Sequence, residues 1–134
     1  MKSSILFAYH LLAGFSDFAT GALLLIAPVF TLALMRLSVP TDSLPFLSFI
    51  GAFVMAVGLS YLYAAMLLRR GGCSSRIEAI WVVTALLRGS VASYVTFAVL
   101  AGALVRGWIV IAAFDAACVA IQAVGLRRGW LTHV

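Results

Sequence analysis

Four long apolar segments with few charges constrain this sequence more than any other feature. They run from about 5 to 35, 44 to 68, 77 to 105 and 107 to 126. About 20 helical residues cross the roughly 30 Å hydrocarbon core of a bilayer, so each segment is long enough to span a membrane. Their hydrophobicity is continuous, unlike the alternating pattern of a transmembrane β-barrel. The sequence therefore predicts an all-α fold, an integral membrane antiparallel four-helix bundle that forms one four-span domain.

The overall composition excludes a water-soluble domain. Hydrophobic residues make up 65% of the 134 residues and charged residues 10%, whereas soluble domains are about half apolar and a quarter charged. No room is left for a soluble catalytic domain beside the membrane segments. We therefore expect the protein to act within the bilayer.

The first segment is about ten residues longer than a bilayer requires. We expect it to tilt, or to end or kink near Pro28, with residues 29–37 at the interface. A signal peptide is the alternative, because Lys2 precedes the apolar residues. We reject it because the apolar stretch continues well beyond the roughly 7 to 15 residues of a signal-peptide core.

The lysine and arginine residues predict the orientation. With four spans, both termini share one side with the connection 69–76. That side carries six basic residues, namely Lys2, Arg69, Arg70, Arg76, Arg127 and Arg128, whereas the other side carries Arg36 and Arg106. The positive-inside rule places both termini in the cytoplasm. The net charge of +5 then reflects topology and contact with anionic lipid headgroups, and we expect no nucleic-acid binding.

Three charged residues fall inside the predicted spans, namely Asp17, Arg88 and Asp115. Each would cost several kcal/mol if it faced lipid at the bilayer centre. All three lie about 16 to 18 Å from the cytoplasmic ends of their spans, which places them at one depth. We expect the Arg88 guanidinium to bridge both carboxylates, because its planar fork donates to two acceptors at once.

Two aspartates against one arginine leave an excess negative charge if all three are ionised. Either one aspartate is protonated, or His10, two turns away on the same face, supplies a positive charge. His10 would then relay protons, or it would extend to the headgroups. The cluster either fixes which helix faces which or forms a ligand or proton site, and both readings stay open. The candidate site residues are Asp17, Arg88, Asp115, His10 and Gln122.

Small and polar residues recur every three or four positions in each segment, which predicts one buried face per helix. These faces carry His10, Gly14, Asp17 and Gly21; Ser48, Gly51, Met55 and Gly58; Trp81, Thr84 and Arg88; and Asp115, Cys118, Gln122 and Gly125. We expect Gly14, Gly21, Gly51 and Gly58 to let another helix approach closely. Thr84 and Gln122 are expected to hydrogen-bond between helices.

Aromatic side chains lie close to the predicted span ends. These are Tyr61, Tyr63, Trp81, Trp108 and Trp130. Amphipathic rings favour the membrane interface. We therefore predict that they anchor the helices there.

The sequence lacks the residues that most catalytic reactions and most cofactor sites require. Cys73 and Cys118 lie at different depths and form no CxxC pair, and His133 at the chain end cannot join His10 in a bis-histidine haem site. Four acidic residues and no metal-binding or phosphate-binding motif argue against a metal-dependent hydrolase or a phosphotransferase. We expect no catalytic residue, no metal and no cofactor.

Several stretches resemble a family of small four-span membrane proteins. They read AGFSDFATGALLLIAP in the first segment and FIGAFVMAVGLSYLYAA in the second, followed by the LLRG and FDAA segments. Together they resemble the bacterial membrane proteins grouped as DoxX-like. The resemblance covers most of the chain and implies a four-helix bundle in the bacterial inner (plasma) membrane. It implies no catalytic residue.

Two functions fit these observations. The first is a non-catalytic membrane subunit or assembly factor that associates with itself or with other subunits of a larger complex, with membrane lipids around it. The second is a small carrier or binding protein for a proton, an ion or a lipophilic small molecule, operated through Asp17, Arg88 and Asp115. The first is favoured because little of the chain protrudes from the membrane to act on a soluble substrate.

Overall fold

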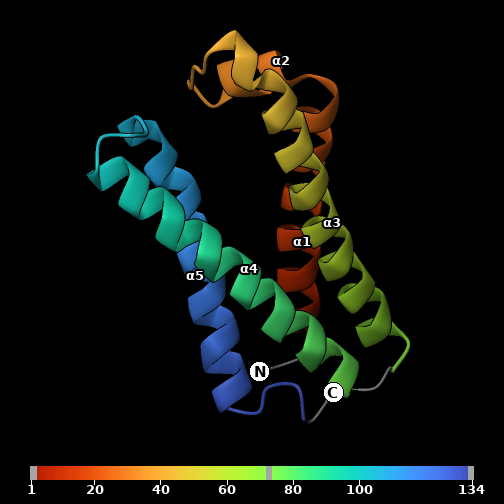
Figure 1. The fold of residues 1–134 in the computed structure, drawn as a ribbon. Helices are drawn as coiled ribbons and strands as arrows, with labels where there is room; N and C mark the ends of the chain where they lie inside the picture. Colours follow the sequence, from red (N-terminus) through yellow and green to blue (C-terminus); the bar gives the residue numbers. More distant parts are fainter. Residues whose placement is uncertain (1–2, 72–73, 133–134) are drawn as a thin grey trace. The chain divides into compact units, whose positions relative to one another are not determined.

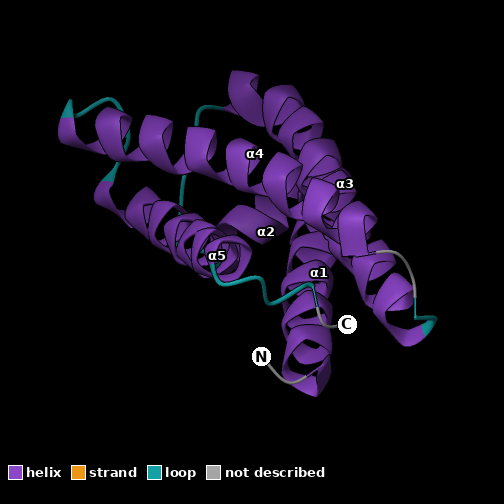
Figure 2. Ribbon diagram, turned by 90° about the horizontal axis from the view of Figure 1, so that it is seen from below, coloured by secondary structure: helices purple, strands orange, loops and turns teal. Residues whose placement is uncertain are grey.

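The computed structural model describes residues 3–71 and 74–132, and it confirms the all-α fold (Figure 1). The helices are α1 (Ser3–Ile26), α2 (Pro28–Leu34), α3 (Leu44–Arg69), α4 (Ser74–Leu100) and α5 (Ile109–Arg127), with short 3-10 helices η1 (Thr41–Ser43) and η2 (Arg106–Trp108). No strand occurs in these described residues (Figure 2). The chain divides into two compact units, Met1–Gly72 and Cys73–Val134.

Four of the described helices are long and apolar enough to cross a membrane. The spans are Ser4–Ile26, Thr41–Arg69, Ser74–Leu100 and Arg106–Arg127. Each unit contributes two of them, joined by a connection that turns the second helix back along the first (Figure 1). The protein is a multi-pass membrane protein.

The first apolar segment breaks at the predicted proline. α1 ends at Ile26, Ala27 adopts φ −139° and ψ 64°, and Pro28 begins α2. Proline has no N–H to donate and its ring clashes with the preceding turn, so a helix cannot continue through this position undistorted. The Thr31 hydroxyl donates to the Ala27 carbonyl over 2.9 Å, which satisfies one carbonyl at the break. The interfacial position of residues 29–37 stays a prediction.

The third segment is shorter than predicted, because α4 ends at Leu100 and not near residue 105. Gly102 adopts a positive φ of 76°. The Gly102 N–H donates to Val99 over 3.1 Å, and the Ala103 N–H donates to Ala98 over 2.8 Å. This is a Schellman motif, in which a left-handed glycine ends the helix. The apolar residues 103–105 follow this glycine. Because they continue the hydrophobic segment, the sequence predicted a helix that ends later than α4 does.

The first unit is built on close contact between α1 and α3, which lie side by side (Figure 1). The two helices meet at four glycines, namely Gly14, Gly21, Gly51 and Gly58. A Cβ on Gly21 would lie 2.2 Å from the backbone nitrogen of Met55 and 2.6 Å from the Gly51 carbonyl oxygen. Two turns away, a Cβ on Gly58 would lie 2.8 Å from the Gly14 carbonyl oxygen. Since such distances are far below van der Waals contact, the two backbones touch where side chains are missing.

Candidate functional site

The second unit contains a buried ion pair between two spans. Arg88 on α4 donates through Nη1 to Oδ1 of Asp115 on α5. Arg88 is 4% exposed and Asp115 8% exposed. The Arg88 Cζ also lies 5.3 Å from the centre of the Phe114 ring, within the range of a cation–π contact. Both charges are therefore compensated inside the unit that contains them.

A second polar contact joins the same two helices, one turn from Arg88 on α4 and two turns from Asp115 on α5. The Gln122 Nε2 donates to the Thr84 Oγ1 over 2.7 Å. The Thr84 hydroxyl in turn donates to the Ile80 carbonyl over 2.7 Å. Gln122 thus donates between helices as predicted, whereas Thr84 accepts that bond and donates within its own helix.

A third contact places a glycine of α5 against a tryptophan of α4. A Cβ on Gly125 would lie 2.4 Å from Cζ3 of Trp81, so this position has room only for a hydrogen atom. Trp130, beyond the end of α5, closes the same position at 2.7 Å. The indole fills the space that the glycine leaves, and α4 and α5 pack closely at this end.

These three contacts form what we call the α4–α5 ladder: Arg88 with Asp115, Thr84 with Gln122, and Trp81 with Gly125. Its members are three and four residues apart on α4 and seven and three residues apart on α5, which puts them on one face of each helix. Because α4 and α5 run in opposite directions, residue numbers rise along one helix as they fall along the other (Figure 2). The ladder can fix the register of the two helices.

One acceptor in the ladder is left over. The Gln122 Oε1 is buried and has no hydrogen-bond partner among the described residues, and the Gln122 side chain is 0% exposed. A buried carbonyl oxygen without a donor typically costs about 1 to 3 kcal/mol. This oxygen can therefore accept hydrogen bonds from a donor.

The remaining acidic candidate, Asp17, lies on α1 in the first unit and is 7% exposed. Its expected contact with Arg88 joins the two units and stays a prediction. Asp17 shares the buried face of α1 with Gly14 and Gly21, as their spacing indicates.

His10 does not extend to the headgroups, contrary to one expectation. Its side chain is 0% exposed, and Nδ1 donates to the Leu6 carbonyl over 2.7 Å. Its ring centre lies 5.4 Å from that of Tyr9 and 5.9 Å from that of Tyr61. The imidazole is therefore packed within aromatic side chains.

The prediction that Tyr61 and Trp81 anchor their helices at the membrane interface is wrong, because both residues are 0% exposed. Both lie near the ends of their helices but on the faces that pack. Their spacing in the sequence indicates the buried face. Tyr61 follows Gly58 by three residues and Trp81 precedes Thr84 by three, so each lies on the same helix face as a small or polar buried residue. Tyr63, by contrast, is 44% exposed.

No group of three His, Cys, Asp or Glu side chains able to hold a metal ion occurs within residues 3–71 and 74–132. Two of the side chains considered from the sequence, Cys73 and His133, lie outside these ranges. Cys118, on the ladder face of α5, is buried.

Comparisons with known proteins give no assignment: no family model matches the chain, and neither a curated protein nor a solved structure matches it. The resemblance to DoxX-like proteins stays a prediction.

Proposed function

We propose that this protein is a non-catalytic integral membrane subunit or assembly factor of a larger membrane complex, and that it packs against a partner span through one face of α4. We place it in the bacterial inner membrane with both termini in the cytoplasm, on the strength of the resemblance and the positive-inside rule. The partner is another membrane-protein subunit or a second copy of the chain.

The observation that carries this proposal is the environment of Gly89. Six glycines lie inside the four long helices, and five of them have an atom of a neighbouring segment 3.0 Å or less from the position of a Cβ. Gly89 is the exception, because nothing lies within 4 Å of that position among the described residues. Glycine lowers helix stability by about 1 kcal/mol relative to alanine, so an open glycine in a span fits a contact with another chain.

The residues beside Gly89 also fit a contact with another chain. Ser93, one turn further on, is exposed, and so is Ser90. The Ser90 hydroxyl donates to the Leu86 carbonyl of its own helix over 2.9 Å. A partner helix could therefore pack against Ser90 without leaving its hydroxyl proton unbonded. Gly89 and Ser93 form the small-xxx-small spacing at which spans approach closely.

The ion pair of the α4–α5 ladder supports a structural role for the buried charges. Arg88 and Asp115 compensate each other within one unit, and fixing which helices face each other is the best-attested use of such pairs. No more than 33% of the most apolar window of any span is buried. Most of each helix surface is therefore free to meet lipid or a partner.

Co-purification from native membranes tests the proposal. The full chain is tagged and extracted in a mild detergent, and Gly89→Leu is compared with Ala120→Leu, a matched control at an exposed alanine of α5. Wild type and the control are expected in one larger assembly of fixed stoichiometry. Gly89→Leu is expected alone, with unchanged thermal unfolding. An unchanged Gly89→Leu assembly, or a monomeric wild type, contradicts the proposal.

A second candidate function is a small carrier or binding protein for a proton, an ion or a lipophilic molecule. The unsatisfied Gln122 Oε1, two turns from Asp115 on the same face of α5, favours it, because a bound donor would satisfy that oxygen. An Asp115→Asn protein that is present in normal amount but has lost a solute-dependent phenotype would support this carrier against the subunit.

A further inference from the structure

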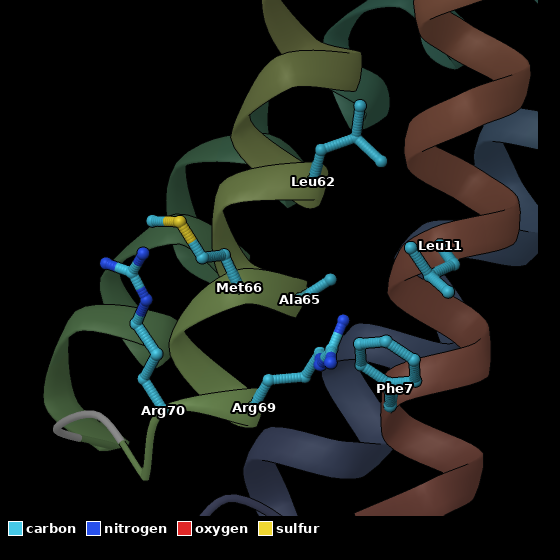
Figure 3. A pocket seen from close by; sticks show the side chains of 7 residues that line it. All are labelled: Phe7, Leu11, Leu62, Ala65, Met66, Arg69 and Arg70. Atoms are coloured by element: carbon cyan, nitrogen blue, oxygen red, sulfur yellow. The ribbon is translucent and has the colours of Figure 1, made fainter.

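An apolar groove of about 480 Å³ lies between α1 and α3 at the end where α3 stops (Figure 3). Phe7 and Leu11 form its α1 side, and Leu62 and Met66 contribute to its α3 side. All of these residues belong to the first unit. The volume falls within the roughly 300 to 1,000 Å³ typical of small-molecule sites.

Two arginines line the groove at this end of α3. Arg69 occupies the last turn, and Arg70 follows as the C-cap residue. Figure 3 shows the Arg69 side chain reaching across from α3 toward Phe7, whereas Arg70 extends along the outer side of Met66. No carboxylate lines the groove, and neither arginine has an ion pair among the described residues. The groove therefore has an apolar floor and a cationic rim, with no carboxylate of the described residues lining it.

The geometry points to an anionic phospholipid as the occupant of this groove. Its phosphate would meet Arg69 and Arg70, and one acyl chain would lie along Leu62, Met66 and Leu11. From Arg69 back to Leu62 the helix rises about 10 Å, so the apolar wall runs from the headgroup level into the hydrocarbon. Guanidinium groups bind phosphate oxygens in a bidentate fashion.

The position of the groove fits the same ligand. The connection that begins at Arg69 lies on the side that carries six basic residues, for which the positive-inside rule predicts the cytoplasm. Anionic lipids are concentrated in that leaflet, and basic pockets between spans bind anionic headgroups there. A role as helix-end charges explains the presence of the arginines, since cations favour a helix C-terminus. It does not explain the open apolar groove beneath them.

The test is a lipid titration of the purified full chain, followed by native mass spectrometry. Phosphatidylglycerol is compared with phosphatidylcholine of the same acyl chains, and inorganic phosphate is titrated separately. We expect phosphatidylglycerol to bind best and the R69Q/R70Q variant to bind it about 30-fold more weakly, as for two charges near a membrane surface. The matched control is R127Q/R128Q, another exposed arginine pair at a helix end, and it is expected to bind like wild type.

A second pair of variants tests the apolar part of the groove with both arginines present. Leu11→Trp fills the groove, whereas Leu12→Trp alters a neighbouring side chain that is 74% exposed and does not line it. Only Leu11→Trp is expected to weaken phosphatidylglycerol binding while thermal unfolding stays unchanged. The proposal would be overturned if the two lipids bound equally well, or if both arginine-pair variants lost the same phosphatidylglycerol affinity. It would also be overturned if inorganic phosphate alone bound in an arginine-dependent way as strongly as the lipid.

Discussion

At the residue scale, Arg88 and Asp115 show how charges are kept inside a membrane span. Either side chain alone would cost several kcal/mol in hydrocarbon, yet each is buried against the other across α4 and α5. Their equal depth was predictable, because 11 or 12 residues separate each from the same predicted face of the membrane. The contact of Arg88 with the Phe114 ring was not, since Phe114 carries no polar signal in the sequence.

Asp115→Asn is expected to destabilise the second unit. The substitution leaves the Arg88 guanidinium buried without its anionic partner, and breaking a buried pair in this way costs about 3 to 5 kcal/mol. Unfolding in detergent, followed by circular dichroism, measures the loss. Glu78→Gln, which removes a carboxylate outside the ladder, serves as the control. An Asp115→Asn protein as stable as wild type would contradict the stabilising role of the pair.

Tyr61 and Trp81 show that the depth of a residue in the membrane does not determine the direction of its side chain. Tyr61 and Trp81 lie near helix ends, where rings commonly face the interface, but both pack against neighbouring helices. Depth follows from position along the sequence, whereas the direction of a side chain follows from the helix face on which it lies. For both residues, the small or polar residue three positions away was the better guide.

At the element scale, the glycines of α1 and α3 explain how the first unit holds together. Gly14 and Gly21 are seven residues apart on α1, as are Gly51 and Gly58 on α3, so the two helices match over two turns. This spacing was visible in the sequence. The end of α4 was less visible, because apolar residues surround the Gly102 cap that stops the helix. Pro28 is the opposite case, since proline breaks a helix whatever surrounds it.

Gly21→Ala and Gly89→Ala are expected to act in opposite directions. A Cβ at position 21 meets the Met55 backbone at 2.2 Å, which forces α1 and α3 apart at a cost of about 1 to 3 kcal/mol, as for overpacked cores. Among the described residues, nothing lies within 4 Å of a Cβ at position 89, so the better helix former is tolerated or stabilises α4 slightly. Thermal unfolding in detergent measures both. A tolerated Gly21→Ala would rule out the tight contact.

At the scale of the whole molecule, two helix pairs make a protein that is almost entirely membrane-spanning. The number and class of the spans followed from the apolar segments, because hydrocarbon leaves a chain few alternatives to helices. The stripes of small and polar residues indicated the buried face of each helix, but not which two helices pair within each unit. The open position at Gly89 could not be predicted, because a glycine in a sequence does not show whether a neighbour faces it.

Cysteine labelling of intact cells tests the predicted topology. In a C73S/C118S background, Ser38→Cys samples the connection before α3, and Ser75→Cys samples the start of α4. Both positions are exposed. A membrane-impermeant maleimide is expected to label Ser38→Cys from outside and Ser75→Cys only after lysis, because the six-to-two division of basic residues favours cytoplasmic termini. The reverse pattern would refute this orientation.

The most direct test of the structural role proposed for the buried charges is the Arg88→Met, Asp115→Leu double variant. Replacing both members of a buried pair with apolar side chains is often neutral or stabilising, whereas removing one is not. We expect the double variant to reach the membrane in normal amount, to unfold at or above the wild-type temperature and to keep its place in the larger assembly. A double variant that folds normally but loses the assembly, or that loses a solute-dependent phenotype, would contradict this structural role.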